Sequence, residues 1–457
     1  MSLGDARPQM AHQWELLFEE RGEAPLGEQS EEASKAASGS EHSGASGLMV
    51  EALGRRNLHA ALKRVRQNQG SPGIDGMTVE ELPDWLRENW PRVREHLLAG
   101  TYQPQPVQRQ PIKKSGGGVR ELGIPTVLDR FIQQALLQVL QPRIDPSFSE
   151  HSYGFRPGRR AHDAIVAAQR YIQEGRRWVV DLDLEKFFDR VHHDVLMERL
   201  SRRIADQTVL RLIRRYLEAG VMVHGVKVER HEGTPQGGPL SPLLANVLLD
   251  EVDQELGRRG HAFVRYADDC NVYVRSERAG QRVMAWLVHA YGRLRLRINP
   301  AKSAVARATS RSLLGFAFWV GSGGRIRRRA APEALRVMKD RVRRLTRRAG
   351  GRNLHQVAGD LRGYLPGWKA YFRLVETPDV LRRLDQWLRH RLRALQLKHW
   401  KRGPTIYREL RARGLSERVA AQVAANGRRC WRNSAMAIHI ALPNTLFDEL
   451  GVPRLAA

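Results

Sequence analysis

The 457-residue chain carries a formal net charge of +27 at pH 7, a basic excess that favours RNA or DNA as a partner. Its two cysteines exclude a disulfide framework and a cysteine-rich zinc site. No apolar run approaches the length of a membrane-spanning helix, and the N-terminus has no signal-peptide pattern. We therefore expect a cytoplasmic protein with no membrane partner, long enough for two or three domains.

The beginning of the chain differs in composition from the rest. Residues 24–47 are mostly Ser, Gly, Ala and Glu, which cannot bury a core. Residues 1–48 are therefore predicted to be a disordered, low-complexity leader. Folded structure is predicted from Met49 onward, where apolar residues recur at helical spacing before the glycine-rich loop Gln69–Gly76.

Basic residues flank a glycine-rich turn in the segment Ile112–Pro125. A lysine offers phosphate oxygens a point charge and an arginine offers a bidentate fork, so the segment suits a hairpin that closes over a triphosphate. As a charge cluster alone, it is more typical of a solvated hairpin. In the following aromatic block, Ser152–Arg160, Arg156 favours a phosphate contact, since such contacts supply most of the affinity for nucleic acid.

Within Trp178–Asp189, a short apolar strand that carries two aspartates, Asp181 and Asp183, leads into the predicted start of a helix. Either carboxylate can be the functional one on this pattern alone. The adjacent pair His192 and His193 cannot both face one site from a regular helix or strand, so we expect surface histidines there.

Turn-forming residues fill the segment Gly233–Pro242, which precedes an apolar helix predicted over Leu243–Leu256. Backbone amides exposed by the glycines, together with the Gln236 side chain, are candidates for binding a nucleotide near a helix N-terminus. The alternative is a plain loop-to-helix junction.

The segment Phe263–Val274 predicts a β-hairpin, because β-branched and aromatic runs flank an Asp-Asp-Cys-Asn sequence near the turn. Asp268 and Asp269 at the tip of a buried hairpin are costly unless a cation neutralises them. Mg²⁺ is the natural candidate, since it takes few carboxylates together with substrate phosphates. Taken alone, the pair is more typical of a solvated turn.

The upstream aspartates, Asp181 and Asp183, reverse the preference for a solvated turn. A nucleotidyl transferase needs two Mg²⁺ ions about 4 Å apart, and acidic residues from two neighbouring strands supply the ligands. The two stretches together indicate the palm of a polymerase.

Downstream, we expect a helix over Arg278–Leu294 behind the sheet and one kinked strand over Leu313–Trp319. From Pro332 the periodicity is helical, and the segment Arg325–Arg413 holds 26 basic and 7 acidic residues. The two apolar stripes of this region are Leu335, Met338, Val342, Leu345 and Leu381, Leu384, Leu388, Leu392, Leu395.

Several segments resemble blocks of the reverse transcriptases. Phe263–Val274 resembles their YxDD block, Val180–Asp189 their first aspartate block, and Glu232–Pro242 their PQG segment. Gln69–Gly76 is similar to the N-terminal extension block of group II intron and related reverse transcriptases, and Gly363–Phe372 to the maturase region. Within the family, the chain is most similar to the group II intron-encoded reverse transcriptase/maturases.

The resemblance selects between the two upstream aspartates. The family pattern places an aromatic residue five positions after the catalytic aspartate, which fits Asp183 with Phe188, whereas Asp181 is followed at that distance by a lysine. Phe188 is then expected to be the steric gate that clashes with a ribonucleotide 2′-hydroxyl; its alternative role is a core aromatic.

The resemblance also implies the remaining site residues. Two Mg²⁺ ions, which Mn²⁺ can replace, are expected to bind the carboxylates of the aspartate trio and the backbone carbonyl of Leu184. The trio is Asp183, Asp268 and Asp269. Lys302 is expected to protonate the pyrophosphate leaving group, although a surface lysine is the alternative. Nucleotide contacts are expected from Lys114, Arg120, Phe188, Gln236, Tyr266. RNA contacts are expected from Arg156, Arg343, Arg344, Lys369, Arg391.

The implied fold class is α+β: a right-hand polymerase with fingers and an antiparallel palm sheet over residues 49–325, followed by an α-helical thumb/maturase domain over residues 326–457. The implied function is RNA-directed DNA synthesis, with splicing assistance and retrohoming. The implied partners are group II intron RNA, an RNA template/DNA primer duplex, dNTPs and target DNA. Many relatives continue into a C-terminal HNH endonuclease, which we do not expect here.

Three alternatives remain. One is a splicing cofactor that no longer polymerises, which the intact aspartate trio argues against. Another is a reverse transcriptase recruited to phage defence or sequence diversification. An RNA-copying RNA polymerase fits less well, given Phe188 at the gate position and Ala267 before the aspartates.

Overall fold

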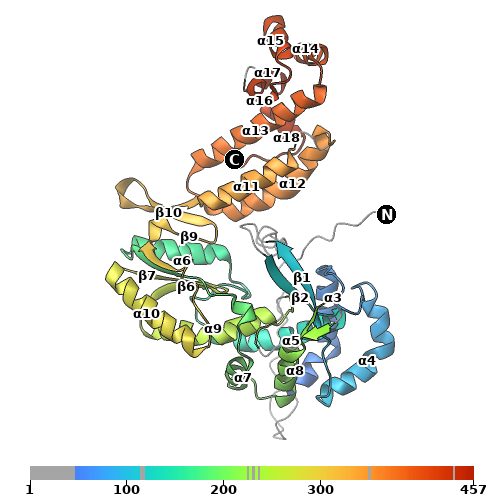
Figure 1. Ribbon diagram of the computed structural model, residues 1–457, viewed down its shortest axis with the longest axis vertical. Helices are drawn as coiled ribbons and strands as arrows, with labels where there is room; N and C mark the ends of the chain where they lie inside the picture. The colour runs from blue at the N-terminus through green and yellow to red at the C-terminus, as the bar shows by residue number, and fades with distance from the viewer. Residues whose placement is uncertain are drawn as a thin grey trace, which may run out of the picture. The chain divides into compact units, whose positions relative to one another are not determined.

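The computed structural model describes residues 47–113, 119–223, 226–228, 232–234, 237–347, 351–435 and 438–456 (Figure 1). Residues 1–46 of the predicted leader, as well as Lys114 and Gln236, lie outside these ranges. The described residues form two compact units that divide between Arg311 and Ser312, earlier in the chain than the domain border expected after residue 325.

The first unit begins with helices that pack around one long buried helix, α5. Thr126 caps this helix by accepting a hydrogen bond from the backbone N–H of Asp129, and its apolar residues are buried along most of its length. The helices of this part are α2 (Gly47–Ala52), α3 (Arg55–Gln67), α4 (Leu82–Leu98) and α5 (Val127–Ile144).

A basic hairpin stands beside these helices. Strand β1 (Val107–Lys113) pairs antiparallel with β2 (Val119–Ile124), which confirms a hairpin around the glycine-rich turn, although residues 114–118 lie outside the described ranges. The sheet has the order β2-β1-β4-β5, with β4 (Val221–Val223) and β5 (Val226–Val228) at its other side.

A second sheet of the first unit carries the aspartates. Its order is β6-β7-β3-β8, and every neighbouring pair is antiparallel. The predicted hairpin and first acidic strand are confirmed. The strands are β3 (Trp178–Leu182), β6 (Ala262–Tyr266), β7 (Asp269–Val274) and β8 (Ala304–Arg307).

Helices cover both faces of this sheet. On one face Tyr171 of α6 packs against Tyr273 of β7, with ring centroids 5.9 Å apart. On the other face α10 approaches so closely at Gly280 that an added Cβ would meet Val305 Cγ1 at 2.4 Å. Because both faces are covered, strand β7 is buried from Cys270 to Val274 rather than alternating between core and solvent.

The helices around the sheet include the two that were predicted. Helix α9, which is buried on most sides, and helix α10 confirm the expected apolar helices. The helices of this part are α6 (Ala161–Gln173), α7 (His193–Ser201), α8 (Gln207–Glu218), α9 (Ser241–Arg258) and α10 (Glu277–Arg293).

The second unit starts with a small antiparallel sheet, β11-β10-β9. The prediction of a single kinked strand over Leu313–Trp319 is wrong. Leu314 and Gly315 both take positive φ angles, 49° and 77°, and turn the chain between two strands. These strands are β9 (Ser312–Leu313) and β10 (Phe316–Val320), followed by β11 (Ile326–Ala330).

The rest of the second unit is helical, as predicted. Met338 and Val342 of the first stripe and the four leucines from Leu384 to Leu395 of the second are buried. No helix in the described ranges is long and apolar enough to cross a membrane. The helices are α11 (Pro332–Leu345), α12 (Leu354–Tyr371), α13 (Pro378–Trp400), α14 (Gly403–Ala412), α15 (Glu417–Ala425), α16 (Cys430–Asn433), α17 (Ile438–Ala441) and α18 (Asn444–Glu449).

Candidate active site

The acidic hairpin closes in a two-residue turn. Tyr266 pairs with Asp269 at the ends of β6 and β7, which leaves Ala267 and Asp268 as the turn. Ala267 has a φ of 58°, in the left-handed region that a residue with a Cβ rarely adopts. The turn therefore presents two consecutive carboxylates on a tightly constrained backbone.

The strand register brings a third carboxylate to this turn. Leu182 of β3 pairs with Cys270 of β7, so continuing the register by one residue sets Asp183 across from Asp269. Side chains alternate between the faces of a sheet, and Asp183 and Asp269 therefore share one face. Two strands distant in sequence thus place their acids together, as predicted.

The electrostatics of the turn favour a cation. Burial first, and then the charges of Asp268 and Asp183, raise the pKa of Asp269 to about 7. Bound positive charge would remove this cost of ionising Asp269. Carboxylate oxygens are the donors that hard divalent cations prefer, so the acids present fit such an ion.

Asp183 is paired with a lysine in this conformation. Its Oδ1 lies 3.2 Å from the Nζ of Lys302, in the loop before β8. Among the described residues, no group of three or more His, Cys, Asp or Glu side chains already surrounds one point as a metal site would. The pairing brings the Lys302 side chain to Asp183, and its proton-donating role stays a prediction.

The loop that carries Lys302 is tied to the backbone around Asp183. The backbone N–H of Asp183 donates to Ser303 Oγ at 3.0 Å, and the N–H of Asn299 donates to the Asp183 carbonyl at 2.9 Å. Leu184 forms an isolated bridge with Ile298. These bonds fix the backbone at the predicted carbonyl ligand of Leu184, which stays a prediction.

The neighbouring acid, Asp181, has partners of its own. Its Oδ2 accepts from Arg311 at 2.6 Å, and Asn271 donates to its Oδ1 at 3.3 Å. Burial raises its pKa, and the Arg311 charge opposes that shift. Asp181 is thus satisfied by the protein itself, which supports the choice of Asp183 as the metal ligand.

The glycine-rich segment lies against the predicted gate. Phe188 is buried in the short helix η2 (Phe187–Asp189), and its carbonyl accepts from the Thr234 N–H at 2.7 Å. The same segment reaches β2, because a Cβ on Gly237 would lie 2.7 Å from the carbonyl oxygen of Gly123. The segment thus connects the gate with the strand that holds Arg120, whose backbone is described but whose side chain is not.

One sequence prediction in this region is wrong. His193 is 2% exposed, not a surface histidine, and its Nε2 donates to the Gly233 carbonyl at 2.8 Å. Burial lowers its pKa, so the neutral ring is favoured. Its separation of 40 residues from Gly233 explains why local sequence could not reveal the contact.

Arg156 has an internal role in the structure. Its guanidinium is buried and donates to Asp145 and to the carbonyls of Ser149 and Ser152. Every N–H of the group has a protein partner. The RNA contact predicted for Arg156 stays a prediction, but it would require these bonds to break.

The second unit presents the predicted basic residues on its long helices. Arg343 and Arg344 of α11 are exposed, and Lys369 of α12 is half-buried. Arg391 of α13 donates to Thr346 Oγ1 at 2.8 Å. The guanidinium carbons of Arg343 and Arg391 lie 5.9 and 5.4 Å from the ring centroid of Trp387, which gathers positive charge around one aromatic ring.

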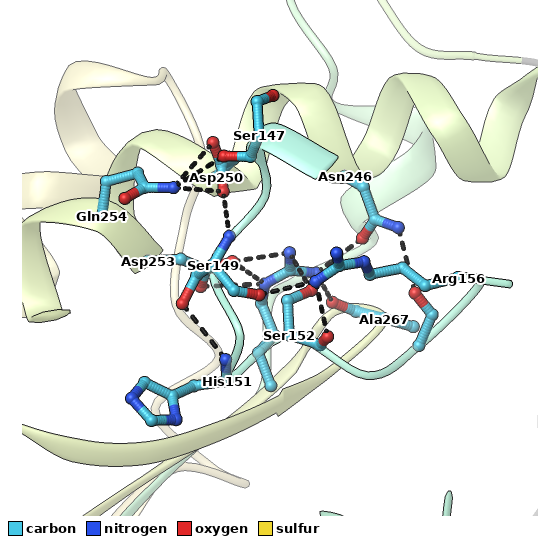
Figure 2. A network of polar contacts seen from close by, with 12 residues as sticks. Ser147, Ser149, His151, Ser152, Arg156, Asn246, Asp250, Asp253, Gln254 and Ala267 are labelled. Carbon is cyan, nitrogen blue, oxygen red and sulfur yellow. Dashed lines mark hydrogen bonds and ion pairs between the residues drawn. The ribbon is translucent and has the colours of Figure 1, made fainter. Parts of the chain in front are cut away.

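Sequence reasoning missed a buried polar network behind the acidic turn. Asp253, Asn246, Ser152 and Ala267, which are labelled in Figure 2, all accept hydrogen bonds from one guanidinium. That group belongs to Arg265, which is fully buried. The available signal was a charged residue inside the otherwise apolar run Phe263–Tyr266.

The antiparallel sheet with its acidic turn is the arrangement expected of a polymerase palm, and comparison with known families points the same way. Residues 112–318 match the family "Reverse transcriptase (RNA-dependent DNA polymerase)". Residues 335–414 match "Group II intron, maturase-specific domain". The chain thus carries a reverse transcriptase domain followed by a group II intron maturase-specific domain, the two domains that the sequence resemblance predicted. A reverse transcriptase domain also implies dependence on a divalent metal ion.

Individual relatives agree with this assignment. The chain is 40% identical over 193 residues to protein YkfC of Escherichia coli, covering 41% of this chain and 51% of that protein. It is 36% identical over 197 residues to the group II intron-encoded protein LtrA of Lactococcus lactis, covering 43% of this chain and 33% of that protein. The chain thus spans about half or less of these relatives.

Among solved structures, the partial Cas6-RT-Cas1–Cas2 complex is similar over 50% of this chain and 38% of that one, at 26% identity. The TM-score of 0.35 is too low to support a conclusion.

Proposed function

We propose that the protein is an RNA-directed DNA polymerase that also binds group II intron RNA to assist splicing and supports retrohoming into target DNA. The observation that carries the polymerase activity is the pairing of β3 with β7, whose last pair, Leu182 with Cys270, lies next to Asp183, Asp269 and the turn residue Asp268. The family of the two matched domains supports the same reaction.

In the proposed mechanism, Asp183, Asp268 and Asp269 would hold two Mg²⁺ ions, which Mn²⁺ could replace. The bound ions would activate the primer 3′-hydroxyl and neutralise the triphosphate. The hydroxyl oxygen would attack the α-phosphorus of the dNTP in line as its proton leaves to solvent; a new P–O bond forms, and the bond from the α-phosphorus to the oxygen that it shares with the β-phosphate breaks. The ammonium of Lys302 is positioned beside Asp183 to give its proton to the leaving pyrophosphate.

Other residues of the chain orient the substrates. Phe188 excludes the 2′-hydroxyl of a ribonucleotide, and Tyr266 lines the sugar and primer side of the turn. Lys114, Arg120 and Gln236 contact the incoming dNTP. The connection of the glycine-rich segment to both Phe188 and β2 supports this shared nucleotide site.

Intron RNA binding is assigned to the basic helices of the second unit. Arg343, Arg344, Lys369 and Arg391 lie in the region that matches the maturase-specific domain. Arg343 and Arg391 also gather around Trp387, and an aromatic ring with flanking cations suits RNA. The proposals that the protein binds target DNA and lies in the cytoplasm rest on the family alone. The buried free thiols of Cys270 and Cys430 agree with a cytoplasmic location.

The decisive experiment is primer extension on an RNA template with dNTPs and Mg²⁺, comparing the intact protein with Asp268→Asn/Asp269→Asn. We expect DNA synthesis by the first and none by the second, while RNA binding measured by fluorescence anisotropy is unchanged. Absence of synthesis by the intact protein, despite tight and salt-sensitive RNA binding, would instead favour the splicing cofactor.

A further inference from the structure

The guanidinium of Arg265 lies at the centre of the network behind the acidic turn. Arg265 and its partner Asp253 are both 0% exposed, and the ion pair measures 2.6 Å. The Arg265 Nη1 donates to Asn246 Oδ1 and to the Ala267 carbonyl, both at 2.9 Å. Its Nη2 donates to Ser152 Oγ at 2.7 Å. All five N–H groups therefore have acceptors.

The bond to Ala267 is the one that reaches the site. This carbonyl belongs to the peptide that joins Ala267 to Asp268, so the guanidinium holds the unit directly before the first carboxylate of the pair. Ala267 also has the φ of 58° that costs energy for a residue with a Cβ. Such a conformation persists only when surrounding contacts hold it.

A second segment, His151–Gly154, packs against the same turn. The backbone N–H of Arg265 donates to the His151 carbonyl, and that of Tyr153 donates to the Arg265 carbonyl, each at 2.9 Å. The next residue, Gly154, is so close that an added Cβ would lie 2.2 Å from Ala267 N and 2.9 Å from Tyr266 C. Asn246, which accepts from Arg265, also donates to the Gly154 carbonyl at 3.0 Å (Figure 2).

From these contacts we infer that Arg265 is a positioning residue for metal binding: with Asn246 and the close approach of Gly154, it holds the strained Ala267 peptide so that Asp268 and Asp269 face the metal ions. The inference rests on the proposed metal site. A buried arginine is costly, and an apolar side chain would fill the same volume more cheaply. Its five directed donors supply geometry that an apolar residue or a lysine cannot.

The test measures Mn²⁺ binding to the purified full-length protein by electron paramagnetic resonance, which does not require polymerisation. Arg265→Lys removes the fork and keeps the charge. We expect its Mn²⁺ affinity to fall about 10- to 100-fold, the usual effect of losing a group that orients a ligand. The Mg²⁺ concentration for half-maximal primer extension should rise in parallel, with a smaller change in kcat at saturating Mg²⁺.

A matched control separates positioning from general damage to a buried arginine. Arg389 of α13 is also buried and donates to Asp448 at 2.9 Å, but it belongs to the second unit. Arg389→Lys should lower the thermal midpoint as Arg265→Lys does and leave Mn²⁺ affinity unchanged.

Gly154→Ala tests the same turn without changing any charge, and it stands in if Arg265→Lys does not fold. Its Cβ pushes on Ala267, so Mn²⁺ affinity should again fall by about 10-fold or more. The control is Gly280→Ala in helix α10, whose Cβ would meet Val305 of β8. That variant should lose stability but bind Mn²⁺ as the wild type does.

Rescue provides the sharpest outcome. Glycine adopts the conformation of Ala267 without strain, so Ala267→Gly should recover about threefold or more of the Mn²⁺ affinity lost in Arg265→Lys. If the wild type binds Mn²⁺ and both Arg265→Lys and Gly154→Ala bind it with the same affinity, the positioning role is wrong. The proposed metal site would still stand. A wild type that binds Mn²⁺ no better than Asp268→Asn/Asp269→Asn would refute the metal site itself.

Discussion

The acidic edge of the β6-β7-β3-β8 sheet and the basic helices of the second unit use charge in opposite ways. At the acidic edge, Arg265 and Asp253 are wholly buried and each has directed partners. On α11, Arg343 is half exposed and pairs with Asp340 one turn away, an arrangement worth little in water. In the proposed function, catalysis would therefore depend on a few oriented groups, whereas RNA affinity would be spread over many exchangeable ones.

The largest expected effect concerns the two aspartates of the first acidic strand. Asp183→Asn should lower primer extension by about 10³-fold or more, because it removes charge from the metal site. Asp181→Asn, which alters a carboxylate already satisfied by Arg311, should lower it by less than about 10-fold. Single-turnover extension at saturating Mg²⁺ measures both. Equal losses in the two variants would contradict the assignment of Asp183.

A smaller effect is expected at the gate. The rings of Phe187 and Phe188 pack 5.0 Å apart, and both are buried, so replacing either with alanine should cost about 3–5 kcal/mol of unfolding free energy. Only Phe188→Ala should also relax sugar selection, with the ratio of kcat/KM for dNTP over rNTP falling about 10- to 100-fold. Loss of selection in Phe187→Ala as well would point to general loosening of the site.

His193 provides a test, through pH, of its buried contact with Gly233. Burial holds its folded-state pKa below 6.5, so the unfolded chain binds the proton more readily, and stability is lost as pH falls below 6.5. His193→Gln keeps a donor to Gly233 and removes the titration. The unfolding free energies from urea titrations at pH 7.5 and 5.5 should therefore differ less in the variant than in the wild type.

The charges around this histidine belong to neighbouring elements: Arg214, Glu218 and His192. If the wild type and His193→Gln lose the same stability on acidification, another group is responsible for the pH dependence.

The smallest single effects are expected on the basic helices. Arg343→Gln and Arg344→Gln should each weaken RNA binding a few-fold, and each should reduce the slope of log affinity against log salt by about 0.7–0.9. Arg258→Gln is the control, since Arg258 is an exposed arginine of α9 in the first unit that pairs with Glu255. A change in primer extension at saturating RNA would contradict the separation of the two regions.

Local pattern revealed much of this protein. Alternating β-branched and aromatic residues predicted the hairpin that ends at Asp268 and Asp269, and helical spacing predicted the stripes of α11 and α13. These features depend on residues close together in the chain, so the amino-acid order is sufficient to read them. The resemblance to a family then selected Asp183 over Asp181.

Only the tertiary structure decided which polar groups meet. Arg311 lies 130 residues from Asp181, His193 lies 40 from Gly233, and Ser152 lies 113 from Arg265. A buried charge is tolerated only where distant partners satisfy it, and no local pattern encodes those partners. The amino-acid sequence by itself therefore determined the elements and the acids, while folding determined the support that holds those acids in place.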